Sequence, residues 1–446
     1  MVCSGYVQKP ILTVMLKYSA YLSNCSRMSQ NSAVKTPSLL GGMMIVAGTA
    51  IGAGMFANPT ATAGVWYVGS IVVMAYTWFC MCASGLMIME ANQHYPAGAS
   101  FNTMVKDLLG PVWNAINGLA FVFVIYILLY AYIFVGGSML EPFVAQLGFA
   151  SASAKIAATV FVLAFALCVW WSTKAVDCVS TVLIVAMVIT FITSVTGMLN
   201  QLSVATLMNA LPEGAGSFYL PYVWVALPVC LASFGFHMNV PSLMAYYQNN
   251  THKVRTSVVG GTLIALAIYC LWQTAVQGVL PRHEFGPVIA AGGDVPVLLK
   301  ALSTHIDIAG LNQVLNAFAF MAIVSSFLGV SLGLFDYAAD MFHFKANRTG
   351  RLKSAAITFV PPYVACILFP TGFVTVIGYV GLGAAVWTAI IPVLMVVASR
   401  RRFAAQTGVY RIGGGKALLW FVFIFGMANI VAQVLTQLGW LPTFKG

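Results

Sequence analysis

The sequence predicts an all-α integral membrane protein with eleven transmembrane helices, of which the first ten form a five-plus-five inverted repeat. The class follows from composition: 21 basic and 10 acidic residues make up 7% of the 446 residues, and 60% are hydrophobic. A soluble domain has about 25% charged residues. The repeat follows from two apolar runs, five spans apart, that glycine and proline interrupt. A soluble enzyme, a nucleic-acid-binding protein and a disordered chain are excluded.

Eleven apolar runs are long enough to cross a hydrocarbon core of about 30 Å, which takes about 20 helical residues. The predicted spans are residues 38–59, 66–92, 113–140, 153–171, 178–199, 219–244, 257–279, 310–339, 354–370, 373–398 and 417–438. We therefore expect residues 37–446 to form the membrane domain, with repeats at about 38–199 and 219–398 and an extra helix at 417–438.

The basic residues predict the orientation of these spans. With a cytoplasmic N-terminus, 17 of the 21 basic residues lie in the cytoplasm, and only Lys155, Arg282, Lys300 and Lys445 lie outside. An odd number of spans then puts the C-terminus in the periplasm. The net charge of +11 is thus explained by topology and needs no nucleic-acid partner.

The first 36 residues differ from the rest of the chain, because they are mixed and polar with only a short apolar patch at residues 11–16. That patch is too short for the apolar region of a signal peptide. We expect residues 1–36 to form a poorly ordered cytoplasmic tail. The residues leave open whether translation starts at Met1 or Met28.

The interrupted first and sixth spans predict a ligand site. An unwound backbone within the membrane leaves N–H and C=O groups unpaired, unless they line a cavity and meet a polar ligand such as an amino acid. Close helix packing is the alternative reading of the glycines, but the matched second interruption favours a binding site. The predicted binding residues are Thr49, Ile51, Gly52, Ala53, Gly54, Ser233, Phe234, Gly235, Phe236 and His237.

Three ionisable residues within the spans are candidates for proton coupling, since buried charges in a membrane are costly. Glu90 can face the bundle interior or pair with a loop cation. Asp336 can take up a proton, or it can pair with Arg348 or Arg351 near the helix end. His237 can titrate near neutral pH, or it can be a hydrogen-bonded structural group.

Two tyrosines of the third span, Tyr126 and Tyr130, lie at i and i+4 and therefore share one helix face. They can contact the ligand's carboxylate or bond a neighbouring helix. Phe234 and Phe236 can stack on an aromatic ligand. With no second histidine at membrane depth, the spans offer no bis-histidine haem site, and we expect neither a cofactor nor a metal.

Several blocks of sequence resemble one known family in the same order along the chain. They include residues 48–56, 84–92, 100–103, 106–110, 231–237, 239–242, 326–330 and 333–337. The chain resembles the hydroxy and aromatic amino acid permeases, most closely the tryptophan-specific members. The resemblance implies a leucine-transporter-type fold and a proton-driven symporter of the bacterial inner membrane. Its substrate would be an aromatic L-amino acid, tryptophan first and tyrosine second.

The chain departs from the family pattern at three positions. Met187 stands where the family usually has a lysine, Met238 where it has a glycine, and Phe320 where it has an asparagine. Two other functions stay open: a permease of the same fold for serine or threonine, and a membrane sensor that binds an amino acid without moving it. The expected partners are the amino acid and the lipid bilayer, with no obligate protein partner.

Overall fold

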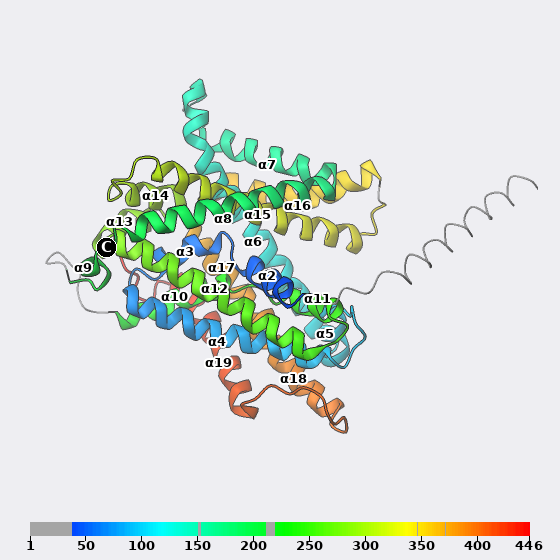
Figure 1. The fold of residues 1–446 in the computed structure, drawn as a ribbon. Coiled ribbons are helices and arrows are strands. Elements are labelled where there is room, and N and C mark those ends of the chain that lie inside the picture. Colours follow the sequence, from blue (N-terminus) through cyan, green and yellow to red (C-terminus); the bar gives the residue numbers. More distant parts are fainter. Residues whose placement is uncertain (1–37, 150–152, 211–218, 346, 371) are drawn as a thin grey trace, which may run out of the picture. The chain divides into compact units, whose positions relative to one another are not determined.

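The computed structural model describes residues 38–149, 153–210, 219–345, 347–370 and 372–446, and in these ranges every regular element is helical. The predicted tail of residues 1–36 lies outside them. The longer helices are α2 (Leu39–Ala50), α3 (Gly54–Ala61), α4 (Trp66–Asn92), α5 (Phe101–Leu109), α6 (Pro111–Val144), α7 (Ser153–Trp171), α8 (Thr173–Leu199), α10 (Val223–Ser233), α11 (Asn239–Tyr246), α12 (Thr251–Val279), α13 (Phe285–Ala290), α14 (Val295–Ser303), α15 (Leu311–Met341), α16 (Arg348–Leu368), α17 (Phe373–Ala385), α18 (Ile391–Arg402) and α19 (Gly415–Gln437). Figure 1 shows their arrangement.

Eight helices within the described residues are long and apolar enough to cross a membrane, and the bent pair α2–α3 raises the number to nine. The predicted sixth span is divided between the short helices α10 and α11, and the predicted ninth span corresponds to α16. A multi-pass membrane protein is therefore confirmed. The count of eleven spans stays a prediction.

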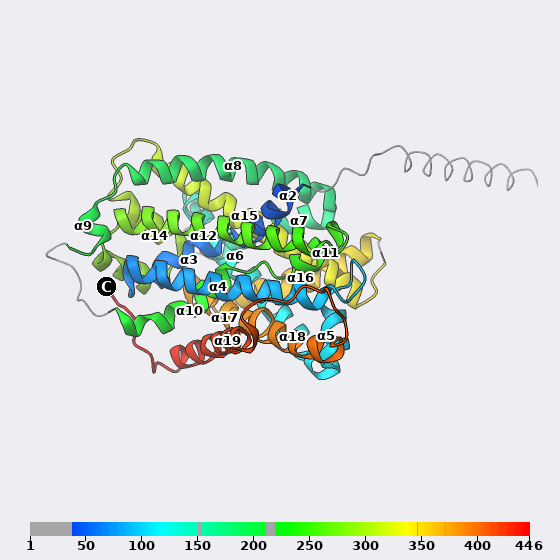
Figure 2. The same cartoon turned by 60° about the horizontal axis from the view of Figure 1, so that its bottom comes forward.

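The inverted repeat is reflected in the packing of equivalent helix pairs. The third predicted span, α6, packs against α17 of the tenth, and the equivalent pair five spans away is α15 of the eighth against α8 of the fifth. Likewise α6 packs on α7, and α15 on α16. In the view of Figure 2, α8 and α19 lie at opposite edges, with α12 and α15 between them.

Local sequence sets the helix boundaries. Ser172 begins α8 as its N-cap, and its hydroxyl accepts a hydrogen bond from the Ala175 N–H at 3.0 Å. Between α5 and α6, Gly110 adopts a φ of 88°, which glycine tolerates, and Pro111 follows at the first helical position. A π-helical turn, η5 (Val386–Ile390), interrupts the tenth span between α17 and α18. Such turns are frequent at functional sites.

Candidate functional site

The first span breaks between α2 and α3, which are bent by 56°. The Ala53 N–H lies in this break and donates to the Ser326 hydroxyl of α15 at 3.2 Å. Gly52 lies beside it, and a Cβ atom added there would be 2.9 Å from the same Ser326 oxygen. A side chain at this position would therefore displace the Ser326 hydroxyl that accepts from the Ala53 N–H.

The sixth span breaks between α10 and α11, at residues 234–238. Ser233, the last residue of α10, contacts α3 across the site. Its hydroxyl donates to the side-chain oxygen of Asn58 at 2.9 Å, and the Gly54 carbonyl lies 3.3 Å away. Both Ser233 and Asn58 are buried. The two breaks are therefore adjacent, as the matched interruptions predict.

Tyr269 of α12 connects the two breaks. Its hydroxyl oxygen lies 2.5 Å from the carbonyl oxygen of Ala50, which ends α2, and 2.6 Å from that of Ser233, which ends α10. The side chain is 1% exposed. The C-terminal ends of the two half-helices, each with a partial negative charge, thus converge on one phenolic group.

Two further polar residues of α12 follow the first broken helix. The Gln273 amide donates to the Thr62 hydroxyl at 2.8 Å, and the Gln277 amide lies 3.5 Å from the Pro59 carbonyl. Tyr269, Gln273 and Gln277 are spaced four residues apart and form one polar stripe. The sequence analysis missed this stripe, although polar residues at i, i+4 and i+8 of an apolar span are a readable signal.

The aromatic residues of the sixth break pack within the protein. Phe234 is fully buried with its ring centroid 5.1 Å from that of Tyr269. Phe236 packs on α4 so closely that a Cβ added to Gly85 would lie 2.6 Å from the ring. Gly235 separates the two rings in the chain. In this conformation neither ring is open to a ligand.

His237 lies within the sixth break. It is fully buried, and its recorded polar contact is a hydrogen bond with the Met81 backbone of α4. Its ring stacks at a tilt on Phe236, with centroids 4.5 Å apart, and it meets Trp387 of η5 edge-on at 6.1 Å. The π-helical turn thus places the indole ring of Trp387 beside the imidazole ring of His237.

Tyr126 and Tyr130 both face α16. Their hydroxyls donate to the backbone carbonyls of Ile357 at 2.8 Å and Phe369 at 2.6 Å. This is the helix-to-helix alternative of the sequence analysis. Tyr132, two residues later, is buried and contacts Ser326, and so it faces the first break.

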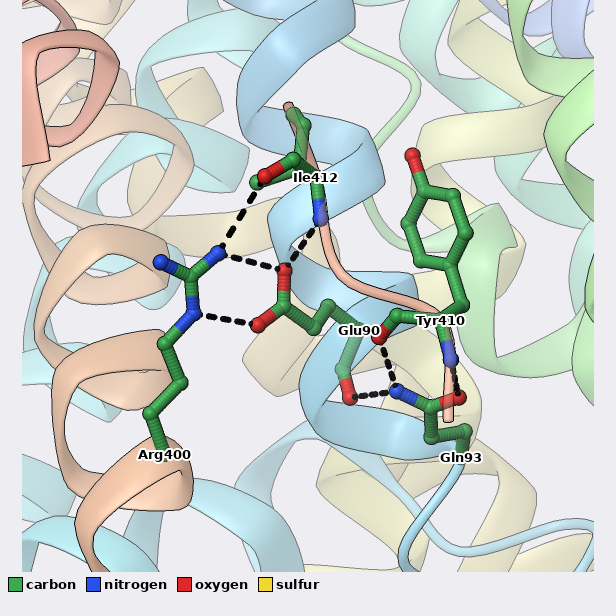
Figure 3. Close-up of polar contacts among 5 residues, drawn as sticks. All are labelled: Glu90, Gln93, Arg400, Tyr410 and Ile412. Atoms are coloured by element: carbon green, nitrogen blue, oxygen red, sulfur yellow. Dashed lines mark hydrogen bonds and ion pairs between the residues drawn. The ribbon is translucent and has the colours of Figure 1, made fainter. Parts of the chain in front are cut away.

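Glu90 lies at the end of α4, where Arg400 of α18 holds it (Figure 3). The guanidinium group donates to the two carboxylate oxygens at 2.6 Å and 3.0 Å, and the Ile412 N–H donates to one of them at 2.7 Å. Gln93 fixes the same loop, because its side-chain amide pairs with both backbone groups of Tyr410. Glu90 therefore pairs with a cation of a neighbouring helix.

One side of α15 and the facing end of α2 are exposed. Gly329, Gly333 and Asp336 lie on this side of α15, and a Cβ added to either glycine would meet no atom within 4 Å. Thr49 of α2 is exposed as well, and its hydroxyl oxygen accepts from the Asn239 amide at 2.5 Å. Arg351 donates to the Val169 and Trp170 carbonyls of α7.

The opposite end of the site is closed. The buried guanidinium of Arg282 donates to the carbonyls of Ala63 and Gly64, just beyond α3. In the loop that follows, the Gly292 carbonyl accepts from the Val374 N–H at 2.9 Å, so the loop is held against the start of α17.

Comparison with known proteins decides the family. The model of the tryptophan/tyrosine permease family matches residues 35–433. The chain belongs to the tryptophan/tyrosine permease family. It is 54% identical over 418 residues to the tryptophan-specific transport protein of Haemophilus influenzae, covering 92% of this chain and 99% of that protein. The tryptophan-specific transport protein of Pseudomonas aeruginosa is 48% identical over 411 residues, with 92% and 98% covered.

The tyrosine permease of Enterobacter agglomerans is 37% identical to this permease over 415 residues, which cover 92% of this chain and 99% of that protein. Because the relatives are transport proteins and permeases, the expectation of a transporter rather than an enzyme is confirmed. Among the described residues, no group of three His, Cys, Asp or Glu side chains can hold a metal ion. The absence of a cofactor stays a prediction.

Two solved transporters share the fold of this permease. Mhp1, a nucleobase-cation-symport-1 family transporter in a closed conformation with bromovinylhydantoin bound, aligns with a TM-score of 0.56 at 13% identity, over 90% of this chain and 93% of that one. MhsT in complex with L-phenylalanine aligns with a TM-score of 0.56 at 15% identity, over 89% and 98%. The predicted leucine-transporter-type fold is confirmed.

Proposed function

We propose that this permease is a proton-coupled symporter that imports aromatic L-amino acids, tryptophan first and tyrosine second, by alternating access. The observation that carries the proposal is 54% identity, across almost the whole chain, to a protein named as a tryptophan-specific transport protein. The two adjacent breaks supply a site with the polarity of an amino acid.

The head group of the substrate binds at the breaks. The partial positive charge at the start of α3, around Gly54, suits its carboxylate, and carbonyl groups at the end of a half-helix suit its ammonium group. The predicted binding residues of both breaks keep this role in the proposal, except Phe234 and Phe236, whose rings are packed within the protein. Tyr132 and Ser326 join them, since they contact each other and the first break.

The closed Arg282 end faces the periplasm, and the exposed Thr49 end faces the cytoplasm. The bias of basic residues supports this orientation, with the N-terminus inside a bacterial inner membrane and the C-terminus outside. Met238, beside the sixth break, is 41% exposed on the cytoplasmic side. We therefore propose that this conformation is inward-facing.

His237 is the first candidate for the proton-coupling group. It lies fully buried in the sixth break beside the Met81 backbone of α4, so a proton taken up there changes the interactions of the break. Glu90 and Asp336 are the other candidates, and Glu90 is the weaker of these two because Arg400 and Ile412 already satisfy it. Met187 stands in the fifth span where the family usually has a lysine, and its side chain has no titratable group.

The proposal is tested by uptake of radiolabelled L-tryptophan into proteoliposomes, with and without an inward proton gradient, in competition with tyrosine, phenylalanine and serine. We expect accumulation that requires the gradient and that only the aromatic amino acids inhibit. Inhibition by serine would instead identify a hydroxy amino acid permease. Binding without accumulation under any gradient would identify a sensor.

A further inference from the structure

The point at which α2 and α10 end carries an unusual concentration of acceptors. The Ala50 and Ser233 carbonyl oxygens lie 2.5 Å and 2.6 Å from one oxygen, the Tyr269 hydroxyl. Both carbonyls end half-helices, so the negative ends of two dipoles meet there. Such a point favours a positive charge or a hydrogen-bond donor, and it would be destabilised if left empty.

We propose that Tyr269 is a positioning residue that joins the two broken helices to α12, so that the first and sixth spans keep one mutual geometry while substrate binds and access alternates. Its phenolic O–H takes the place that a bound cation would otherwise fill between the two carbonyl ends. The substrate then meets a site whose two halves are already aligned.

The rest of α12 supports this assignment. Gln273 and Gln277, both fully buried, contact Thr62 and Pro59 after the first break, whereas Tyr269 contacts Ala50 before it. The helix α12 therefore follows the first broken helix on both sides of its break. Of the three residues in the stripe, Tyr269 is the one that also contacts α10, through its hydroxyl. Phe234, which follows Ser233, packs edge-on against the Tyr269 ring and fixes the phenol between the two ends.

The chemistry of the group makes the proposal specific. A hydroxyl has one proton, so it can donate to only one of the two carbonyls at a time. A phenylalanine at this position removes the donor and keeps the ring. A 4-aminophenylalanine, introduced by amber suppression, carries two N–H donors and can satisfy both carbonyls at once.

The test is hydrogen exchange, measured by mass spectrometry on the full-length permease in lipid nanodiscs. With Tyr269→Phe we expect exchange about tenfold faster in peptides that cover residues 50–54 and, equally, in those that cover 233–238. With 4-aminophenylalanine we expect exchange at both breaks as slow as in the wild type or slower. Tyr363→Phe is the matched control, since it removes a 2.8 Å tyrosine contact, to Thr159, between α16 and α7. It should leave both breaks unchanged.

Substrate affinity is the second measurement, and it rests on the proposed function. We expect the Kd for L-tryptophan to rise about tenfold in Tyr269→Phe, to recover with 4-aminophenylalanine and to stay within about twofold in Tyr363→Phe. Faster exchange at one break alone, or at neither, would overturn the role of Tyr269. If the wild-type permease does not bind tryptophan, the proposed function is wrong. The hydrogen-exchange result would still test the role of Tyr269.

Discussion

The Arg400 guanidinium binds both carboxylate oxygens of Glu90, and this pair joins α4 to α18 where the loop before α19 folds back over it. Glu90 is 1% exposed, and the Ile412 N–H supplies a third hydrogen bond. A carboxylate with three donors is strongly held. The pair therefore anchors the end of α4.

The two members of this pair should differ in their tolerance to substitution. Arg400→Met leaves a buried negative charge without its partner, and we expect it to lower stability by about 3–5 kcal/mol. Glu90→Gln removes the buried charge and leaves the partly exposed arginine, so a smaller loss is expected. Thermal unfolding of the purified permease measures both. Equal losses would show that charge burial does not dominate at this site.

A side chain at position 52 should disturb the contact between the Ser326 hydroxyl and the Ala53 N–H. Gly52→Ala brings a Cβ atom to 2.9 Å from the Ser326 oxygen, and we expect tryptophan uptake to fall by about tenfold. Gly48→Ala in α2 is the control, because the added atom meets nothing within 4 Å. Removing the obstructing oxygen in Gly52→Ala/Ser326→Ala should restore part of the uptake. No recovery in this double variant would argue against the contact with α15.

Substitution of His237 should separate coupling from substrate movement. If His237 carries the coupled proton, His237→Asn should lower gradient-driven accumulation by about tenfold or more, while exchange of labelled for unlabelled tryptophan continues. Asp336→Asn, in the exposed part of α15, tests the rival candidate in the same two assays. Loss of accumulation in Asp336→Asn alone would transfer the coupling role to that residue.

Asp294, in the loop before α14, should make stability depend on pH. Burial, and less strongly the negative charge of Glu141, raise the pKa of Asp294 from 3.8 to about 6. The folded protein then binds more protons than the unfolded chain between these values, so stability falls as the pH rises through about 4 to 6. The full effect is about 3 kcal/mol above that range.

Asp294→Asn removes this titration. We expect its melting temperature to exceed that of the wild type at pH 8 and to approach it at pH 5, measured on the same preparations. The hydrogen bonds of Asp294 with Ser138 and with the Val295 backbone oppose the rise in its pKa. The side-chain amide of the Asp294→Asn variant keeps part of these contacts. A constant difference between the two proteins at both pH values would contradict a raised pKa.

Much of the architecture follows from the amino-acid sequence, because a membrane requires long apolar helices and tolerates breaks only where they serve a site. The helical class, the breaks around Gly52 and Gly235 and the repeat between them were predicted from local patterns. Membership of the permease family was likewise indicated by short blocks of sequence. These features depend on which residues are near each other in the chain.

The face that each side chain presents was decided by the tertiary structure. Tyr126 and Tyr130 share a helix face, but only the packing of α6 shows that this face meets α16 and that Tyr132 meets the first break. An all-apolar helix has no polar side to mark its orientation, since lipid and protein interior are equally apolar.

The partners of Glu90 and Tyr269 were also beyond the sequence. Arg400 lies 310 residues from Glu90, and the Ala50 carbonyl lies 219 residues from Tyr269. A backbone carbonyl, moreover, leaves no mark in the amino-acid sequence. The helical class, the two breaks and the family can be inferred from the amino-acid sequence alone. The tertiary structure determined which hydroxyl joins the breaks and which carboxylate is already paired, because both depend on contacts between distant segments.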